Sequence, residues 1–180
     1  MCGAARSARR PNRPSRWLGE QVTQTCAVRH IRASPESVYR ALVDADTVAA
    51  WRVPDGMNAV VHVFDARVGG RFRVSLTYET PHGRGKTEAR TDTYHGLFIE
   101  LVPNQRVVEE FEFEASDPDF AGVMRITTTL IDAHGGTDLV MVHDGLPPGV
   151  SAEDNQIGTE MAVDKLAALV ESRCDPRLNR

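Results

Sequence analysis

The stretch SAEDNQIGTEMAVDKLAALVESR, residues 151–173, predicts one long helix that decides the fold. Its opening, Ser151 to Asp154, is similar to a capping box, in which a serine side chain accepts a hydrogen bond from the first turn. The helical pattern then continues without a proline to Arg173, which corresponds to a length of about 34 Å. Apolar residues cover a wide arc of this helix, so we expect it to be covered more deeply than an ordinary surface helix.

The chain before this helix has the pattern of successive strands. Residues 72–79 alternate strictly between apolar and polar, which places four apolar side chains on one face of a strand. The short spacing of the strands indicates an antiparallel meander, because parallel strands need long crossover connections. The other strands predicted in this part of the chain are 60–64, 88–101, 106–114, 123–131 and 139–143.

The N-terminal part of the domain adds one strand and two short helices. A strand is predicted at 24–32, and Ser34-Pro35-Glu36 then begins a helix with serine as its cap and proline in its first turn. A second short helix is predicted at 44–51. This order predicts an α+β fold, in which a curved antiparallel sheet of about seven strands wraps on the long C-terminal helix. A cavity can remain between the sheet and that helix.

Length and charge limit the possible classes of protein. The chain has 180 residues and a formal net charge of −4, which fits one ordinary domain. The first twenty residues contain five arginines against one glutamate, so the rest of the chain is acidic, which argues against nucleic-acid binding. We expect residues 1–20 to form a disordered basic tail, with a contact arm or an organelle transit peptide as alternatives. One domain then covers 21–174, followed by a flexible C-terminus at 175–180.

Cysteine and histidine spacing bears on location and on metal binding. Cys2, Cys26 and Cys174 are odd in number and widely spaced, which favours a reducing cytoplasm and argues against a zinc site. The histidines show no ligand spacing either, so we expect no metal. No apolar run reaches the roughly 20 residues of a membrane span. We expect no cofactor, since the sequence has no nucleotide-binding loop and no serine-hydrolase motif.

Four local matches to one family lie in order along the chain. SPESVY at 34–39 and AAW at 49–51 resemble the family's opening helix and its tryptophan. VGGRF at 68–72 resembles a glycine turn into the third strand. The remaining matches are YHG at 94–96 with ELVPNQRV at 100–107, and GTDL, HDGLP and DKLAAL at 136–139, 143–147 and 164–169. Over about 22–172 the chain resembles the helix-grip domains of the START-like (SRPBCC) superfamily, and more closely the family of the Hsp90 ATPase activator homologue C-terminal domain.

The resemblance implies three kinds of function. The first is binding of a hydrophobic small molecule in the cavity between the sheet and the C-terminal helix. The second is a co-chaperone-like contact with a chaperone, connected to the stress response. The third is a small enzyme of the cyclase or hydrolase type that uses the same cavity. The fold alone does not decide among them, and the chain is expected to be a monomer or a homodimer.

Two departures from the family pattern affect these expectations. Gly158 is followed by Thr159, where many relatives have a tryptophan, and the smaller side chain implies more room or more polarity at that place. The eukaryotic co-chaperone also carries a separate N-terminal domain that engages the chaperone, whereas this chain has a short basic segment there. The second departure argues against activation of a chaperone ATPase.

Two titratable residues are candidates for chemistry. His143 shares a strand face with Met141, so we expect it to point toward the helix and any cavity, where it could move a proton or anchor a ligand. Glu109 lies beside Phe111 on an apolar face, where a carboxylate could serve as a general base. The alternatives are a histidine hydrogen-bonded within the core, and a glutamate paired with an arginine such as Arg125.

The predicted ligand site consists of large side chains on faces expected to point inward. Trp51 could stack on a ligand at the cavity mouth or could plug the core. Arg90 and Tyr94 share a face, with Asp92 between them in alternation, and they line either the cavity or the outer surface. We favour binding over catalysis and assign no catalytic residue beyond the candidates above. The residues predicted to bind the ligand are Trp51, Phe72, Tyr78, Phe111, Met141, His143 and Met161.

Overall fold

The computed structural model describes residues 24–82 and 85–174. Its elements are, in chain order, β1 (Gln24–Ile31), α1 (Pro35–Leu42), α2 (Ala45–Trp51), β2 (Met57–Phe64), β3 (Arg71–Tyr78), β4 (Thr91–Val102), β5 (Arg106–Phe113), the short 3-10 helix η1 (Pro118–Phe120), β6 (Met124–Ala133), β7 (Gly136–Asp144) and α3 (Ala152–Cys174). This order confirms the predicted sequence of strands and helices. The expected tail at 1–20 and C-terminal segment at 175–180 lie outside the described residues.

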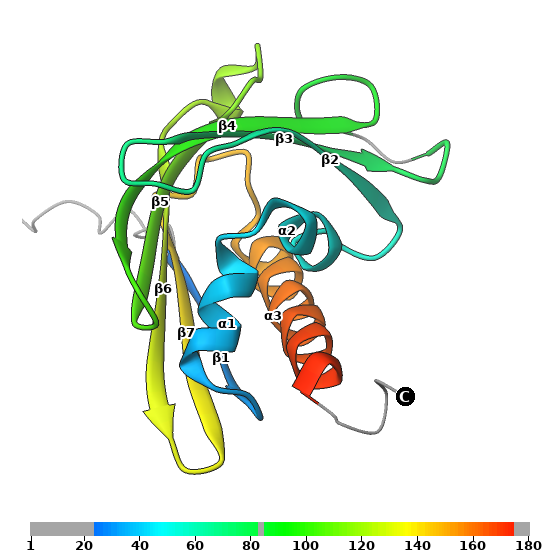
Figure 1. The fold of residues 1–180 in the computed structure, drawn as a ribbon. Helices are drawn as coiled ribbons and strands as arrows, with labels where there is room; N and C mark the ends of the chain where they lie inside the picture. Colours follow the sequence, from blue (N-terminus) through cyan, green and yellow to red (C-terminus); the bar gives the residue numbers. More distant parts are fainter. Residues whose placement is uncertain (1–23, 83–84, 175–180) are drawn as a thin grey trace, which may run out of the picture.

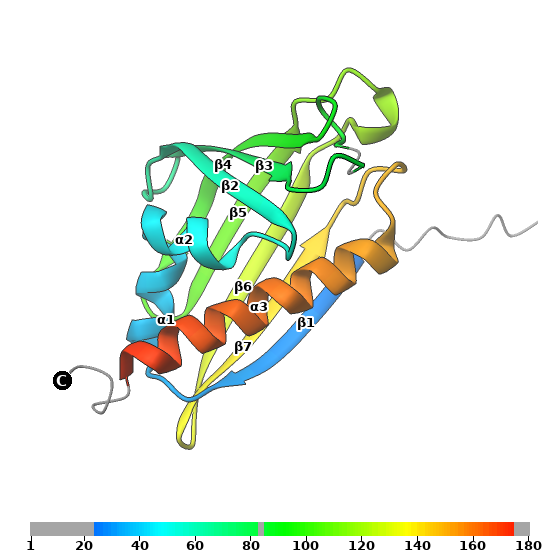
Figure 2. The ribbon, with the colours of Figure 1, turned by 90° about the vertical axis from the view of Figure 1, so that its right-hand side faces the viewer.

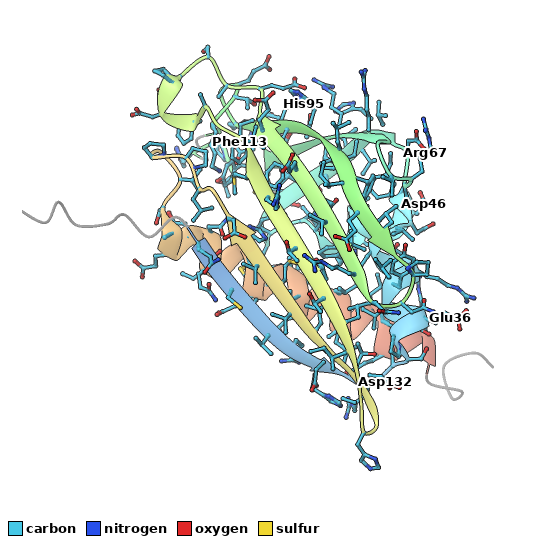
Figure 3. The ribbon with its side chains drawn as sticks, turned by 90° about the vertical axis from the view of Figure 1, so that its left-hand side faces the viewer. Glu36, Asp46, Arg67, His95, Phe113 and Asp132 are labelled. Carbon is cyan, nitrogen blue, oxygen red and sulfur yellow. The ribbon has the colours of Figure 1, made fainter. Side chains whose placement is uncertain are left out.

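The seven strands form one antiparallel sheet in the order β1-β7-β6-β5-β4-β3-β2. The sheet curls so that α3 lies within its concave side, with α1 and α2 at one end (Figure 1). Turned by 90°, the same arrangement shows α3 running along β1 across the open side of the sheet (Figure 2). Polar side chains, including His95, point away from the opposite, outer face (Figure 3). The predicted helix-grip α+β fold is confirmed.

Side-chain caps fix where the two short helices begin. The Ser34 hydroxyl accepts a hydrogen bond from the Ser37 amide at 3.3 Å, and Pro35 occupies the first turn of α1. Asp44 caps α2 by accepting from the Thr47 amide at 2.9 Å. Because these caps end one element and start the next within a few residues, the chain crosses the end of the sheet in two short helices.

The long helix α3 is covered on one face only. The Asp154 amide donates to the Ser151 hydroxyl at 3.2 Å, as the capping box predicts. Its buried side chains follow helical spacing: Ala162, Val163, Leu166, Ala167 and Val170. Ile157 is 50% exposed and Ala168 is exposed, so the expectation of deep cover on several faces is wrong. The reason is the open sheet, which leaves the outer side of α3 in solvent (Figure 2).

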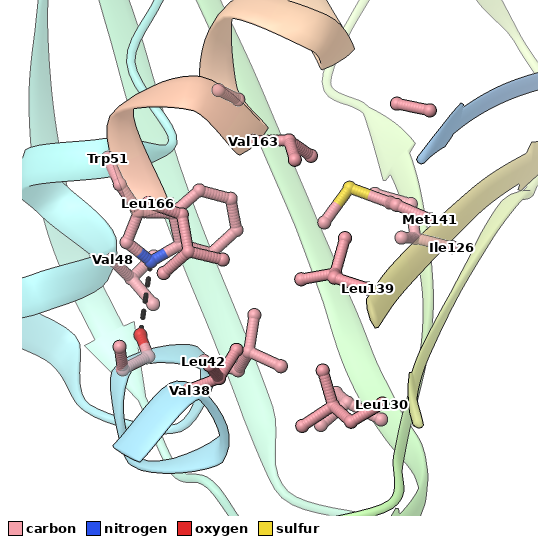
Figure 4. Packing of buried hydrophobic residues seen from close by; sticks show 14 of the residues in the cluster. Val38, Leu42, Val48, Trp51, Ile126, Leu130, Leu139, Met141, Val163 and Leu166 are labelled. Carbon is pink, nitrogen blue, oxygen red and sulfur yellow. Dashed lines mark hydrogen bonds between the residues drawn. The ribbon is translucent and has the colours of Figure 1, made fainter. Parts of the chain in front are cut away.

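One part of the core lies where α1 and α2 meet the second half of α3. Trp51 is 1% exposed, and its indole N–H donates to the Ala41 carbonyl oxygen at 3.0 Å, the dashed line in Figure 4. Leu139 and Leu166 face each other across this cluster and have no measurable exposure. Burial of this kind contributes about 1.5–3 kcal/mol for each large apolar side chain.

Three strands begin three residues away from their predicted starts, and one of them is β7, which begins at Gly136 instead of 139. β2 begins at Met57, three residues before the predicted start, and continues the alternation toward the turn after α2. β4 begins at Thr91, because the Thr91 amide donates to the Glu88 carbonyl oxygen at 2.7 Å and closes a tight turn. Arg90 therefore lies in that turn and is exposed, whereas Tyr94 is 6% exposed. The expectation that Arg90 and Tyr94 share a face is wrong for this reason.

Candidate ligand-binding site

A cavity of about 550 Å³ lies between the concave face of the sheet and the first half of α3. Its volume falls within the range of small-molecule sites, which is roughly 300–1,000 Å³. Six of the seven residues predicted to bind the ligand line it, namely Trp51, Tyr78, Phe111, Met141, His143 and Met161. The six predicted residues that line the cavity therefore come from the end of α2, from three strands and from α3.

Phe72, the seventh predicted residue, does not line this cavity. It is 1% exposed, and its ring meets those of Tyr94 and Phe98 edge-on, with centroids 6.4 and 5.3 Å away. Gly96 of β4 makes this close packing possible, since a Cβ there would lie 2.6 Å from the Phe72 ring and 2.2 Å from the Glu110 carbonyl oxygen. Phe72 thus supports the wall of the cavity from behind.

A buried ion pair holds Arg52, one of the polar residues that line the cavity. Arg52, directly after α2, donates to both carboxylate oxygens of Glu109 on β5, with 3.0 Å between Nη1 and Oε1. Their side chains are only 14% and 4% exposed. Burial by itself lowers the pKa of Arg52, but the adjacent Glu109 charge outweighs it, and the pKa is raised. The Glu109 carboxylate therefore stabilises the charged form of Arg52.

Arg125 is not the partner of Glu109. Strand pairing sets Arg125 opposite Glu110, and the two form an ion pair on the outer face of the sheet. Glu109 is one residue earlier, so it points to the concave side, where Arg52 is available. The expected arginine partner exists, but the alternation of the strand assigns a different one.

A second ion pair lines the cavity near its mouth. The Lys86 ammonium lies 2.6 Å from Oδ2 of Asp92, whose side chain is 5% exposed, and the Lys86 amide also donates to Asp92. Sequence reasoning did not identify Arg52 or Lys86, because both lie in loops without periodicity. The alternation of β4 was a usable signal for such a cation, because it places Asp92 on the same inward face as Tyr94. A carboxylate that points into the protein requires a positive charge nearby.

His143 of β7 is the most unusual polar group of the site. It is 8% exposed, and neither ring nitrogen has a hydrogen-bond partner among the residues that the structure describes. Burial, followed by the positive charge of Arg52, lowers the pKa of His143 to about 4, although Asp144 acts in the opposite direction. The imidazole is therefore neutral at neutral pH and faces the cavity, as the alternation of β7 predicts.

Glu109 and His143 do not form a catalytic pair. Glu109 is opposite Ile126 in the sheet, and Ile126 is opposite His143. Neighbouring strands are about 4.8 Å apart, so the two backbones lie roughly 10 Å apart with Ile126 between them. Glu109 is also fully engaged by Arg52. This arrangement can hold and orient a bound molecule, but it presents no acid and base converging on one position.

Two further absences concern the residues in 24–82 and 85–174. They contain no group of three or more His, Cys, Asp or Glu side chains that could hold a metal ion. No helix among them is long and apolar enough to cross a membrane.

Known proteins share the sequence pattern and the fold of this chain. The model of a family described as activator of Hsp90 ATPase homolog 1-like protein matches residues 32–171. The chain belongs to this family. A protein from Chromobacterium violaceum, known from its crystal structure, is 32% identical, with 83% of this chain and 97% of that protein covered and a TM-score of 0.74.

More distant solved structures share the fold of this activator homologue family. A protein from Rhodobacter sphaeroides is 24% identical, covers 86% of this chain and 96% of its own, and has a TM-score of 0.69. An AHSA1-like protein from Aeromonas hydrophila is 19% identical over 84% of this chain and 94% of its own, with a TM-score of 0.63. A search of curated proteins found no match. These likenesses support the helix-grip, START-like architecture.

In this member of the family, the first half of α3 has small side chains toward the cavity. Thr159 is 4% exposed, and its hydroxyl donates to the Asn155 carbonyl oxygen at 2.7 Å. A Cβ on the preceding Gly158 would meet no atom within 4 Å. Thr159, which stands in place of the tryptophan of the family pattern, therefore lines the cavity with a small side chain.

Proposed function

We propose that this protein binds a hydrophobic small molecule in the cavity between the sheet and α3. The observation that carries the proposal is the cavity itself, about 550 Å³ in volume, whose lining combines aromatic, methionine and aliphatic side chains with polar and charged ones. Ligand sites have this composition, because apolar contacts supply affinity and fixed polar groups supply orientation. Trp51, Phe111 and Met141 are the expected apolar contacts, and Met161 covers them from α3.

Native mass spectrometry tests this proposal directly. The protein is purified without denaturation and compared with a sample stripped of lipids by unfolding and refolding. We expect extra mass in the first sample that is absent from the second. If no extra mass is found, the refolded protein is titrated with Nile red, a neutral lipophilic dye whose emission reports an apolar site. Failure of both measurements would refute the proposal.

A matched pair of variants assigns the binding to the cavity. Ala162 lines the cavity, so Ala162→Phe fills part of it, whereas Ala168 is exposed on the same helix and Ala168→Phe serves as the control. We expect Ala162→Phe to weaken Nile red binding at least tenfold and Ala168→Phe to leave it unchanged. Overpacking costs about 1–3 kcal/mol, so unfolding curves must accompany the titrations.

The family description supports a second candidate, a contact with the Hsp90 chaperone. The contact surface that we propose is the outer face of β3, β4 and β5, where Arg73 pairs with Glu114 and His95 lies 3.3 Å from Glu112. A chaperone pull-down and its ATPase rate test this candidate. Because this face is remote from the cavity, Ala162→Phe should leave the contact intact. No recovery of chaperone and no change in its ATPase rate would exclude this function.

We also propose a cytoplasmic location. Cys26 is an exposed free thiol on β1, and free exposed thiols are typical of reducing compartments. Cell fractionation with an antibody against the chain tests this location, and recovery in an oxidising compartment would contradict it.

A further inference from the structure

The orphaned imidazole of His143 points to a specific kind of ligand. Buried polar groups in native proteins almost always have hydrogen-bond partners, and an exception calls for an explanation. His143 is 8% exposed, lines the cavity, and has no partner for either ring nitrogen within the described part of the chain. The cost of leaving it unpaired disappears if a bound molecule supplies the missing hydrogen bond.

Neighbouring protein groups are already engaged elsewhere. Thr25 lies directly opposite His143 across the β1–β7 pair, but its hydroxyl donates to the Asn155 side-chain oxygen at 2.5 Å. Thr159 donates to the main chain of α3. On the other side of His143, Ile126 is apolar. The hydrogen-bonding capacity of the imidazole is therefore directed to the cavity and is left for a ligand.

The charges around the cavity argue against an anionic ligand. The cations in its wall, Arg52 and Lys86, are each neutralised by their own carboxylate, Glu109 and Asp92. These cations leave no uncompensated positive charge for a bound carboxylate or phosphate. The free energy lost by removing such an anion from water would therefore not be offset. Burial also disfavours the imidazolium form of His143, since its pKa is lowered.

A neutral imidazole offers one donor and one acceptor. A hydroxyl group can donate or accept, so it can pair with a ring nitrogen that faces the cavity in either tautomer. We infer that the preferred ligand is an apolar molecule with an uncharged hydroxyl group that hydrogen-bonds to His143. This inference rests on the cavity binding proposed above. The apolar body lies against Trp51, Met141 and Met161, and His143 selects the polar end.

Three probes of one shape test this inference: naphthalene, naphthol and naphthoate. They share an apolar body and differ in carrying no polar group, a neutral hydroxyl or an anionic carboxylate. Titration calorimetry at neutral pH gives their dissociation constants. We expect naphthol to bind most tightly and naphthoate least. Equal affinity of naphthol and naphthalene would overturn the role of His143 while leaving the cavity function standing, and tightest binding of naphthoate would overturn the preference for an uncharged ligand.

Variants separate the hydrogen bond from general affinity. In His143→Leu, the preference for naphthol over naphthalene should fall about tenfold, which is the contribution of one good hydrogen bond. His143→Gln retains a donor and an acceptor and should restore part of that preference. His134→Leu makes the same change at an exposed turn and should alter nothing. An unchanged preference in His143→Leu refutes the inference, and if the variant does not fold, the ranking of the three probes by the native protein decides it. If none of the probes binds, the cavity function itself fails.

Discussion

Lowering the pH should destabilise this protein through one residue, His143. The unfolded chain protonates this imidazole with a pKa of 6.5, whereas burial and Arg52 keep it neutral in the folded protein down to about pH 4. Between these values the unfolded state binds one proton more than the folded state, so stability falls as the pH falls. The loss amounts to about 2 kcal/mol between pH 7 and pH 5, at about 1.4 kcal/mol per pH unit once the unfolded imidazole is charged.

The assay is urea unfolding at several pH values, on the native protein and on His143→Leu. Leucine does not titrate, so the stability of the variant relative to the native protein should rise by about 2 kcal/mol from pH 7 to pH 5. His134→Leu, in the exposed turn between β6 and β7, controls for the loss of one histidine. Glu114 and Glu171 do not interfere in this window, because hydrogen bonds from their arginine partners lower their pKa below 4.5. A stability difference that stays within about 0.5 kcal/mol over the whole range would refute the buried, neutral state of His143.

Two other perturbations test the cavity wall. Arg52→Met should cost about 3–5 kcal/mol in the free energy of unfolding, because it leaves the Glu109 charge buried without a partner, and adding Glu109→Leu should recover most of this cost. If the double variant is no more stable than Arg52→Met, the result contradicts the ion pair between Arg52 and Glu109. Gly96→Ala should cost about 1–3 kcal/mol, since its Cβ would meet the Glu110 carbonyl oxygen at 2.2 Å, whereas Gly158→Ala should gain about 0.5–1 kcal/mol in open space. Thermal unfolding of both glycine variants checks the opposite signs.

The fold could be predicted because its signals are local and repeated. Period-2 alternation in residues 72–79 and the caps at Ser34 and Ser151 each specify an element without reference to distant residues. The covered face of α3 could not be predicted in the same way. Its apolar residues spread widely around the helix, and only the curl of the sheet decides that Leu166 is buried while Ala168 is exposed.

The site was predicted in part for a related reason. Strand alternation placed His143 and Met141 inward, since each strand position has two possible directions and one apolar neighbour decides between them. Alternation could not supply the partner of Glu109. Arg52 lies 57 positions away in the sequence and reaches Glu109 only because α2 ends above β5. Ion pairs between a loop and a strand follow from tertiary structure, which a single sequence does not reveal.

Strand β7 and helix α3 each contribute to the packed core at one end of the domain and to the cavity at the other. On β7, Leu139 packs into the dense core, while His143, four residues later, faces the cavity. On α3, Leu166 is completely buried near α1, whereas Gly158 and Thr159, two turns earlier, leave space. Packing at the buried end therefore keeps the strands and α3 in position at the other end, where the cavity lies between them. A ligand in the cavity supplies packing contacts and hydrogen bonds that the protein does not make there. Its binding should therefore raise the stability of the whole domain.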